Sequence, residues 1–194
     1  MRIVAGKYKG TNLRGPADRR VRPTAEPVRA ALLDRLAPEL AGARVLDLFA
    51  GSGALGLEAL SRGAASCDFV ETRETSLSAL RSNIIACRSR ERTRVFVRDA
   101  LPYAAMLTVG AYHVAFCDPP YESRMLDRVV DHWRASHFAL VLACEHARTH
   151  DGLPPGDEAL AVGETVVTIY RAPAGTVVRE QGARREGRGR RPGP

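Results

Sequence analysis

From residue 44 onward, short apolar runs of strand length alternate with longer segments of helical spacing. Strands that are nearly all apolar and are separated by helices predict a mostly parallel sheet with helices on both faces. The expected fold is therefore α/β, a Rossmann-like, doubly wound sheet. Strands are expected at 44–49, 66–71, 94–98, 112–118, 138–145 and 164–170, and helices at 54–62, 75–87, 103–107 and 125–135. The last strand follows its neighbour without a long helix between them, so we expect it to enter antiparallel by a hairpin.

The first 23 residues differ in pattern from the sheet domain. Apolar and basic residues alternate around Gly6 and Gly10 over 2–13, which predicts a short β-hairpin. A loop follows, and Thr24 is the expected N-cap of a helix that ends near residue 38. We therefore divide the chain into a basic N-terminal hairpin extension (1–23), the main domain (24–178) and an Arg/Gly-rich tail (179–194), which lacks hydrophobes and is expected to be disordered in isolation.

Positive charge is concentrated at the two ends of the chain. Residues 1–29 hold eight Arg and Lys against two acids, and residues 179–194 hold six Arg against two acids, whereas the whole chain has a net charge of +7. The body is therefore mildly acidic. Basic ends on a mildly acidic domain are typical of a protein that binds a polyanion. The tail alone could instead serve solubility.

The sequence does not indicate a membrane span, disulfide bonds or a metal site. No apolar run approaches the roughly 18 residues of a membrane span, and no signal-peptide core is present, so a cytoplasmic protein is expected. The four cysteines are widely spaced and are expected to be reduced core residues. His146 and His150 have an i, i+4 spacing that zinc could use with a distant Cys, but solvated histidines are the commoner outcome, and no metal is expected.

A glycine loop follows the first strand. Gly51, Gly53 and Gly56 form G-x-G-x-x-G, which is the dinucleotide fingerprint, but Asp47 lies ahead of it inside the strand end. An acid there would repel a pyrophosphate and suits a cationic ligand such as the amino group and sulfonium of S-adenosylmethionine. Asp47 could instead only cap the loop.

Two further acids are expected at the same edge of the sheet. Glu71 ends the second strand and can accept ribose hydroxyls, and Asp99 can accept an adenine amino group or simply cap the next helix. The candidate cofactor-binding residues are Asp47, Phe49, Gly51, Ser52, Gly53, Glu71, Thr72, Asp99 and Ala100.

The fourth strand ends in the sequence Asp118-Pro119-Pro120-Tyr121. The two prolines must stop the strand, so that carbonyl groups point outward beside the Asp118 carboxylate. An exocyclic amine on a nucleobase requires two acceptors for its hydrogens and an aromatic face for its ring, which Tyr121 offers. Asp118 can also take a proton as a general base, and Tyr121 can stack on an extruded base. These four are the candidate catalytic residues.

The combination of motifs resembles a known family. Asp47-Leu-Phe-Ala-Gly-Ser-Gly53 with Asp118-Pro-Pro-Tyr121 is similar to class I S-adenosylmethionine-dependent amino-methyltransferases. The N-terminal Met1-Arg-Ile-Val-Ala-Gly-Lys-Tyr-Lys-Gly10, then Arg22-Pro-Thr24 with Arg29, Glu58-Ala-Leu-Ser-Arg-Gly-Ala64 and Phe69-Val-Glu71 resemble the bacterial 16S rRNA (guanine(966)-N2)-methyltransferase family up to about residue 170. Leu33, where an aromatic residue is usual, and the tail depart from that family's pattern.

The resemblance implies transfer of one methyl group from S-adenosylmethionine, without a metal, to the N2 amine of a guanine in 16S rRNA, leaving S-adenosylhomocysteine. It implies as partner an assembled or nearly assembled 30S subunit. No membrane partner is expected, and the protein is expected to be a monomer. The RNA-binding candidates are Arg2, Lys7, Lys9, Arg19, Arg20, Arg22, Thr24 and Arg29.

Three other functions stay open. An adenine-N6 methyltransferase of DNA or RNA would use the same Asp118-Pro-Pro-Tyr121 segment, because both targets are exocyclic amines. A non-catalytic RNA-binding assembly factor could keep the fold, although it would not need Asp118-Pro-Pro-Tyr121. A nicotinamide oxidoreductase would account for the glycine loop, but it would not account for Asp47 or for Asp118-Pro-Pro-Tyr121.

Overall fold

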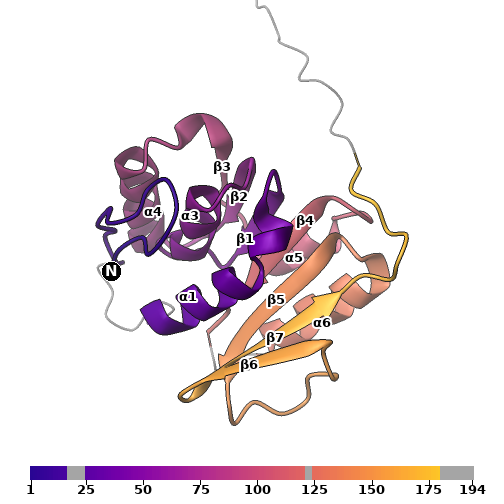
Figure 1. The fold of residues 1–194 in the computed structure, drawn as a ribbon. Coiled ribbons are helices and arrows are strands. Elements are labelled where there is room, and N and C mark those ends of the chain that lie inside the picture. The colour runs from indigo at the N-terminus through magenta and orange to yellow at the C-terminus, as the bar shows by residue number, and fades with distance from the viewer. Residues whose placement is uncertain (17–24, 121–123, 180–194) are drawn as a thin grey trace, which may run out of the picture.

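A computed structural model describes residues 1–16, 25–120 and 124–179. The elements follow the expected alternation of strands and helices (Figure 1). The helices are α1 (Glu26–Arg35), α2 (Ala37–Leu40), α3 (Ala54–Ser61), α4 (Glu74–Ala86), the 3-10 turn η1 (Arg90–Arg92), α5 (Ala100–Ala105) and α6 (Met125–Ser136). The strands are β1 (Arg44–Leu48), β2 (Ser66–Val70), β3 (Thr93–Phe96), β4 (Tyr112–Cys117), β5 (Ala139–Ala147), β6 (Glu158–Val162) and β7 (Thr165–Arg171).

The sheet has seven strands in the order β3-β2-β1-β4-β5-β7-β6. The first five strands pair in parallel, and β7 lies antiparallel to both β5 and β6. This confirms the predicted doubly wound, mostly parallel sheet and its antiparallel last strand. The sequence reasoning missed β6, which borders only β7 and completes the edge of the sheet.

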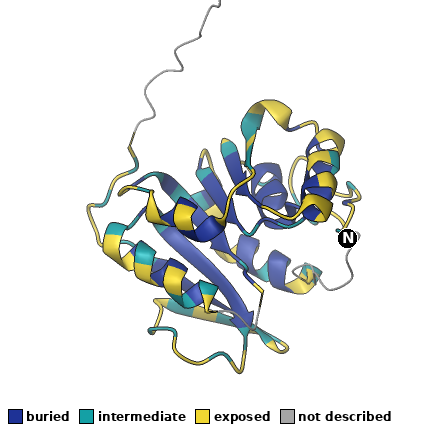
Figure 2. Cartoon of the chain, turned by 180° about the vertical axis from the view of Figure 1, so that it is seen from behind, coloured by how far each residue is buried: buried dark blue, intermediate teal, exposed yellow. Residues whose placement is uncertain are grey.

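Helices cover both faces of the sheet, and successive strand residues pack into opposite layers. On one face, Val45 of β1 packs with α1, α3 and α4, and on the other Leu46 packs with α5 and α6. Figure 2 shows the central strands as the buried part of the molecule, with exposed residues on the outer sides of the helices. The core therefore consists of two apolar layers that hold the strand ends in place.

The N-terminal segment folds back on itself less regularly than a hairpin. Within residues 1–16, one isolated antiparallel bridge joins Arg2 to Asn12, and Leu13 N–H donates to Met1 O at 2.9 Å. Ile3, Tyr8 and Leu13 are buried in the same apolar layer as α3 and α4. The predicted hairpin is thus represented by one antiparallel bridge between the two arms of the segment, which packs on the domain. The proposed boundary at 23/24 lies outside the described residues.

Two helix starts differ from the sequence expectation. The N-cap position of α1 is Ala25, one residue after the predicted Thr24, and Ala25 makes no side-chain cap; Thr24 lies outside the described residues. α1 ends at Arg35, and Pro38 lies in the first turn of α2 rather than at the end of α1. α5 begins at Ala100, before the predicted 103, because Asp99 caps it.

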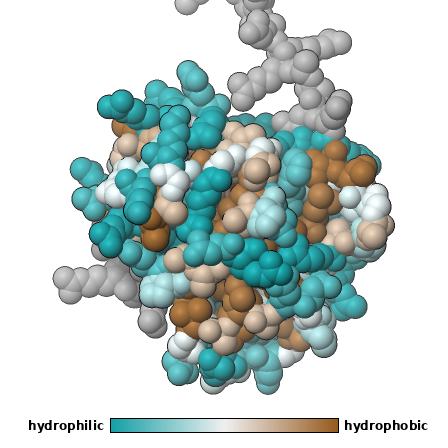
Figure 3. All heavy atoms as spheres, viewed as in Figure 1, coloured by the Kyte–Doolittle hydropathy of each residue, from teal (hydrophilic) through white to brown (hydrophobic). Residues whose placement is uncertain are grey.

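The surface in the view of Figure 1 is mixed in character. Figure 3 shows hydrophobic residues in separate patches between hydrophilic ones on that face. In the described parts of the chain, no helix is long and apolar enough to cross a membrane.

Candidate functional site

The strand register brings the predicted site residues to one edge of the sheet. Leu48, the last residue of β1, lies opposite Val70 of β2 and Cys117 of β4, and Val70 lies opposite Phe96 of β3. Because these strands are parallel, the segments that follow them leave from the same edge. Ligands bind at this carboxyl edge in open α/β sheets. Residues 49–53, 71–72, 99–100 and 118–120 therefore gather there, as the sequence predicts.

The loop between β1 and α3 has a left-handed backbone at three positions. Phe49, Gly51 and Gly53 have φ values of 58°, 55° and 78°. Such a φ is strained for a bulky residue like Phe49, and strain of this kind often marks functional loops. The loop shape is thus fixed by residues of the predicted motif.

The three glycines of the motif serve different purposes. A Cβ on Gly53 would lie 2.4 Å from Leu80 Cδ1, and one on Gly56 would lie 2.5 Å from both Cys67 Sγ and Phe69 Cε1. These two glycines let α3 and the loop pack closely on β2 and α4. A Cβ on Gly51 would meet only the Phe49 carbonyl oxygen, at 3.9 Å. Gly51 therefore presents open backbone that a ligand can approach.

Asp47 lies beneath the loop rather than on its surface. Its side chain is 2% exposed, and Oδ2 accepts a hydrogen bond from Gly56 N–H at 2.9 Å. Burial raises the pKa of the Asp47 carboxyl to about 8; the Gly56 hydrogen bond lowers it and the nearby Glu71 charge raises it. The loop-closing role considered for Asp47 is thus present, and its contact with a cationic ligand stays a prediction.

Glu71 joins the end of β2 to the glycine loop. Its Oε2 accepts from Gly51 N–H at 2.8 Å, and its Oε1 accepts from Thr72 N–H at 2.7 Å and Arg73 N–H at 2.8 Å. Because a carboxylate offers about four acceptor positions, these three bonds leave capacity for a ligand hydroxyl. The acid predicted to hold a ribose therefore also orders the loop beside it.

Asp99 follows β3 at the same edge. Its Oδ1 accepts from Leu101 N–H at 3.0 Å, so Asp99 is the N-cap of α5, one of the two roles considered for it. Asp99 and Thr72 are exposed, while Ala100 and Ser52 are buried. Their predicted contacts with a cofactor are compatible with this placement and stay predictions.

Asp118, Pro119 and Pro120 follow directly after β4. Asp118 is half-buried, Pro119 is buried and Pro120 is exposed. β4 ends at Cys117, where the predicted proline stop ends the strand. Asp118 thus lies at the ligand-binding edge, next in sequence to the strand that borders β1. The prediction for Tyr121 falls outside the described residues.

The basic N-terminal segment presents some of its predicted RNA contacts to solvent. Lys7 and Lys9 are exposed, and the Arg2 side chain is 64% exposed, with its Nε 3.5 Å from Glu26 Oε1. These cations are available to a polyanion. Arg19, Arg20, Arg22 and Thr24 lie outside the described residues.

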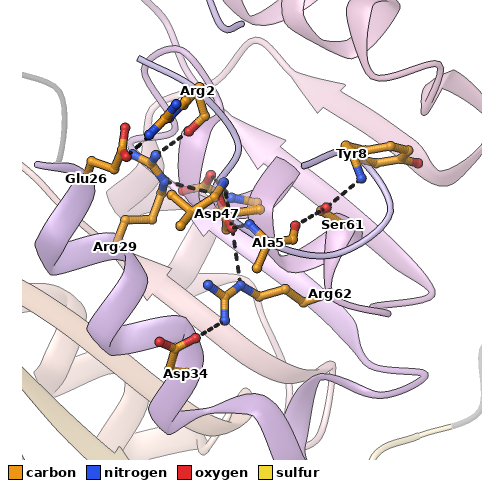
Figure 4. A network of polar contacts seen from close by, with 12 residues as sticks. Arg2, Ala5, Tyr8, Glu26, Arg29, Asp34, Asp47, Ser61 and Arg62 are labelled. Atoms are coloured by element: carbon orange, nitrogen blue, oxygen red, sulfur yellow. Dashed lines mark hydrogen bonds and ion pairs between the residues drawn. The ribbon is translucent and has the colours of Figure 1, made fainter. Parts of the chain in front are cut away.

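Arg29 does not fit its predicted RNA contact. It is fully buried, its Nε lies 3.4 Å from Glu58 Oε2, and its Nη2 donates to Arg2 O at 2.6 Å (Figure 4). Glu58, also fully buried, accepts from Ala5 N–H at 2.9 Å. The guanidinium is therefore enclosed with a carboxylate, and we correct the role of Arg29 to anchoring the N-terminal segment.

The cysteines lie in the core, and His146 and His150 contact side chains of β7 and α6. All four cysteines are free and buried, as predicted. His146 Nε2 lies 2.8 Å from Thr168 Oγ1, and His150 Nε2 lies 3.0 Å from Asp127 Oδ1. Over 1–16, 25–120 and 124–179, no group of three or more Cys, His, Asp or Glu side chains is placed to hold a metal ion.

The strand order with its inserted antiparallel β7, together with the glycine loop at the carboxyl edge, defines a Rossmann-like methyltransferase fold. Among solved structures, a hypothetical protein of Thermus thermophilus superposes with a TM-score of 0.75 at 31% identity, over 89% of this chain and 99% of that one. An RNA methyltransferase from Salinibacter ruber, solved with S-adenosyl-L-homocysteine, superposes with a TM-score of 0.61 over 84% of this chain and 98% of that one. At 14% identity, the second likeness concerns the fold alone.

The sequence profile of the family described as "Conserved hypothetical protein 95" matches residues 1–154. The chain belongs to this family. It is 33% identical over 159 residues to the Escherichia coli (strain K12) protein named "Ribosomal RNA small subunit methyltransferase D", covering 79% of this chain and 78% of that protein. It is 32% identical over 173 residues to the Bacillus subtilis (strain 168) protein YlbH, covering 87% of this chain and 91% of that protein.

Proposed function

We propose that this chain is an S-adenosylmethionine-dependent methyltransferase that modifies the exocyclic N2 amine of a guanine in 16S rRNA of the small ribosomal subunit. The observation that carries the proposal is the gathering of the Gly51 loop, Glu71 and Asp118 at one edge of the sheet. Names of relatives support ribosomal RNA as the substrate class. The choice of guanine N2 rests on the resemblance of residues 1–10, 22–29 and 58–71.

The site suits a cofactor of this kind. Gly51 leaves room for a ligand beside the loop backbone, and Glu71 can accept a further hydrogen bond from that ligand. Asp47 places a titratable carboxyl beneath the loop. S-adenosylmethionine supplies a methyl group already attached to a leaving group, so neither a metal nor a covalent nucleophile on the protein is required. What the chain must contribute is alignment, a proximity effect that can reach about 7–11 kcal/mol in favourable systems.

Asp118 is the residue we assign to the amine. Its carboxylate and a carbonyl of the adjoining proline segment can accept the two N–H groups of the base and turn the nitrogen toward the methyl group. As nitrogen gains the methyl group it also becomes more acidic, and Asp118 can take the released proton as a positioned base. Tyr121 would stack on the base.

Binding of the RNA is assigned to the N-terminal segment. Lys7 and Lys9 are exposed cations on a segment anchored beside α3 and α4, and such residues bind phosphates without reading the sequence. The target base is then selected by how the folded RNA places it at Asp118.

The direct test is methylation with labelled S-adenosylmethionine of small subunits that lack the modification, with naked 16S rRNA and with DNA as parallel substrates. Digestion to nucleosides identifies the product. We expect N2-methylguanosine from the subunit. N6-methyladenine, or label only in DNA, would overturn the substrate assignment while keeping the chemistry. No transfer to any substrate, together with RNA binding, would favour the assembly-factor alternative.

A further inference from the structure

One side chain touches both the N-terminal segment and the glycine loop. Asn83 lies on α4 and is 1% exposed. Its Oδ1 accepts from Arg14 N–H at 2.8 Å, and its Nδ2 donates to Arg14 O and to Ser52 O, both at 2.9 Å. Both hydrogens of the amide are therefore used, one toward each segment.

The same helix supports the loop a second time. Leu80, one turn before Asn83, occupies the space that a Cβ on Gly53 would need, at 2.4 Å from its Cδ1. Ser52 is itself 5% exposed. The backbone at 52–53 therefore rests on α4 through a hydrogen bond and an apolar contact, so a displacement of the loop must disturb Asn83.

Several further anchors of the N-terminal segment lie on α3, beside the bond from Arg29 of α1 to Arg2 O. Ser61 Oγ accepts from Tyr8 N–H at 2.8 Å and donates to Ala5 O at 2.5 Å, and Glu58 accepts from Val4 and Ala5 N–H. Figure 4 shows the Ser61 contacts with Ala5 and Tyr8. The bonds named for Ser61 and Glu58 hold residues 4–8 and none of them reaches the loop. Asn83 differs because it bonds both.

We propose that Asn83 is a positioning residue that couples cofactor binding to RNA binding. The inference rests on the proposed function, since it takes residues 1–16 as part of the RNA contact and the loop as the cofactor contact. A buried amide whose partners move apart is left with unsatisfied groups, which is costly. A cofactor that fixes Ser52 therefore also favours the position of Arg14 that Asn83 requires. Such a coupling is reciprocal, so RNA bound by the N-terminal segment must tighten cofactor binding equally.

The test compares Asn83→Ala with Ser61→Ala as a matched control. Both variants remove buried hydrogen bonds to the N-terminal segment, but Ser61→Ala leaves the contact with Ser52 intact. Calorimetry gives the affinity for S-adenosylhomocysteine, and filter binding gives the affinity for unmodified small subunits with and without that ligand. The coupling ratio is the affinity for subunits with the ligand divided by the affinity without it.

We expect the wild-type ratio to exceed one. Asn83→Ala should weaken S-adenosylhomocysteine binding by about tenfold, the effect of losing one or two net hydrogen bonds, and should bring the ratio close to one. Ser61→Ala should weaken subunit binding, keep the ligand affinity within about twofold and retain the wild-type ratio. A role of Asn83 in stability alone would lower the melting temperature without changing the ratio.

A folded Asn83→Ala protein with wild-type ligand affinity and ratio would overturn the inference, as would a wild-type ratio of one. If Asn83→Ala does not fold, hydrogen exchange of Arg14 N–H in the wild-type protein replaces it, because Asn83 Oδ1 accepts from this group. Protection of Arg14 N–H that does not rise when S-adenosylhomocysteine binds would overturn the inference. Failure of the wild-type protein to bind the ligand or to methylate subunits would instead contradict the proposed function itself, so the two failures are distinguishable.

Discussion

Glu71 Oε2 and Gly51 N lie 2.8 Å apart, joined by a hydrogen bond that fixes the glycine loop to the end of β2. The same carboxylate holds Thr72 and Arg73 N–H through its other oxygen. The shape of the loop therefore depends on the side chain that we propose to bind the ribose.

Replacing this carboxylate should impair both functions. In Glu71→Gln, an amide N–H group would face backbone N–H donors on at least one side, so we expect the affinity for S-adenosylhomocysteine to fall at least about tenfold. Calorimetry measures it. The control is Glu74→Gln, because the Glu74 side chain is 83% exposed and makes only a loose contact with Arg81 at 3.8 Å. Equal affinities of the two variants would contradict this role of Glu71.

Asp47 should make the ligand-free protein less stable as pH rises. The folded state keeps this carboxyl protonated up to a pKa of about 8, whereas the unfolded chain loses the proton near the ordinary value of 3.8. Between these values the unfolded state binds fewer protons, so the free energy of unfolding falls with increasing pH and levels off above about 8. Asp47→Asn removes this component, because the amide does not titrate. Urea titrations of both proteins at several pH values should give a stability difference that shifts in favour of the variant from about pH 5 to about pH 8; a constant difference would argue against the raised pKa.

Arg29 should matter for folding rather than for RNA affinity. Arg29→Ala removes the buried contact with Glu58 and the bond to Arg2 O, whereas Glu58 keeps Arg62 Nε at 3.2 Å. Because hydrogen bonds to charged groups are worth about 1.5–3 kcal/mol, we expect the free energy of unfolding to fall by about that amount. Lys9→Ala, at an exposed position, should change it by less than about 0.5 kcal/mol and should weaken RNA binding instead. Denaturant titration and RNA binding of the two variants separate these roles. A stable Arg29→Ala protein with reduced RNA affinity would restore the RNA contact predicted from the sequence.

Substitutions at two glycines of the motif should affect ligand binding and packing to different extents. Gly51→Ala places a methyl group in open space but keeps a positive φ, so we expect a stability loss of about 1–2 kcal/mol and a clear loss of cofactor affinity. Gly56→Ala drives a methyl group against Cys67 and Phe69 and should cost more stability, about 1–3 kcal/mol or above. Thermal melts with and without S-adenosylhomocysteine measure both effects. If the ligand stabilises Gly51→Ala as much as the wild-type protein, the open backbone at Gly51 is not a contact surface.

The sequence predicted the strand ends well because their signals are local. A glycine loop, an acid after an apolar run and a proline pair each mark the end of a strand, and parallel strands bring such ends to one edge. This accounts for the correct placement of Gly51, Glu71 and Asp118. It also accounts for the missed β6, whose alternating, partly exposed residues follow a loop with two prolines and border one strand only.

Burial of charged residues was harder to predict, because it depends on contacts between distant segments. Arg29 was grouped with the basic N-terminus, yet its spacing from Leu33 places it on the buried side of α1. Glu58 is the single charged residue of α3, whose other residues are apolar except Ser61, and such a lone charge is a signal for a buried partner. Asn83 carried no such signal, since its partners are the backbone groups of Arg14 and Ser52.

The most direct test of the account is the effect of Asp118→Ala on methyl transfer to small subunits, measured beside its affinity for S-adenosylhomocysteine. If Asp118 holds the target amine at the end of β4, transfer is lost while the affinity for the ligand stays within a few-fold of the wild-type value. Transfer at the wild-type rate, or loss of ligand binding in parallel with transfer, would contradict the assignment of Asp118 to the amine.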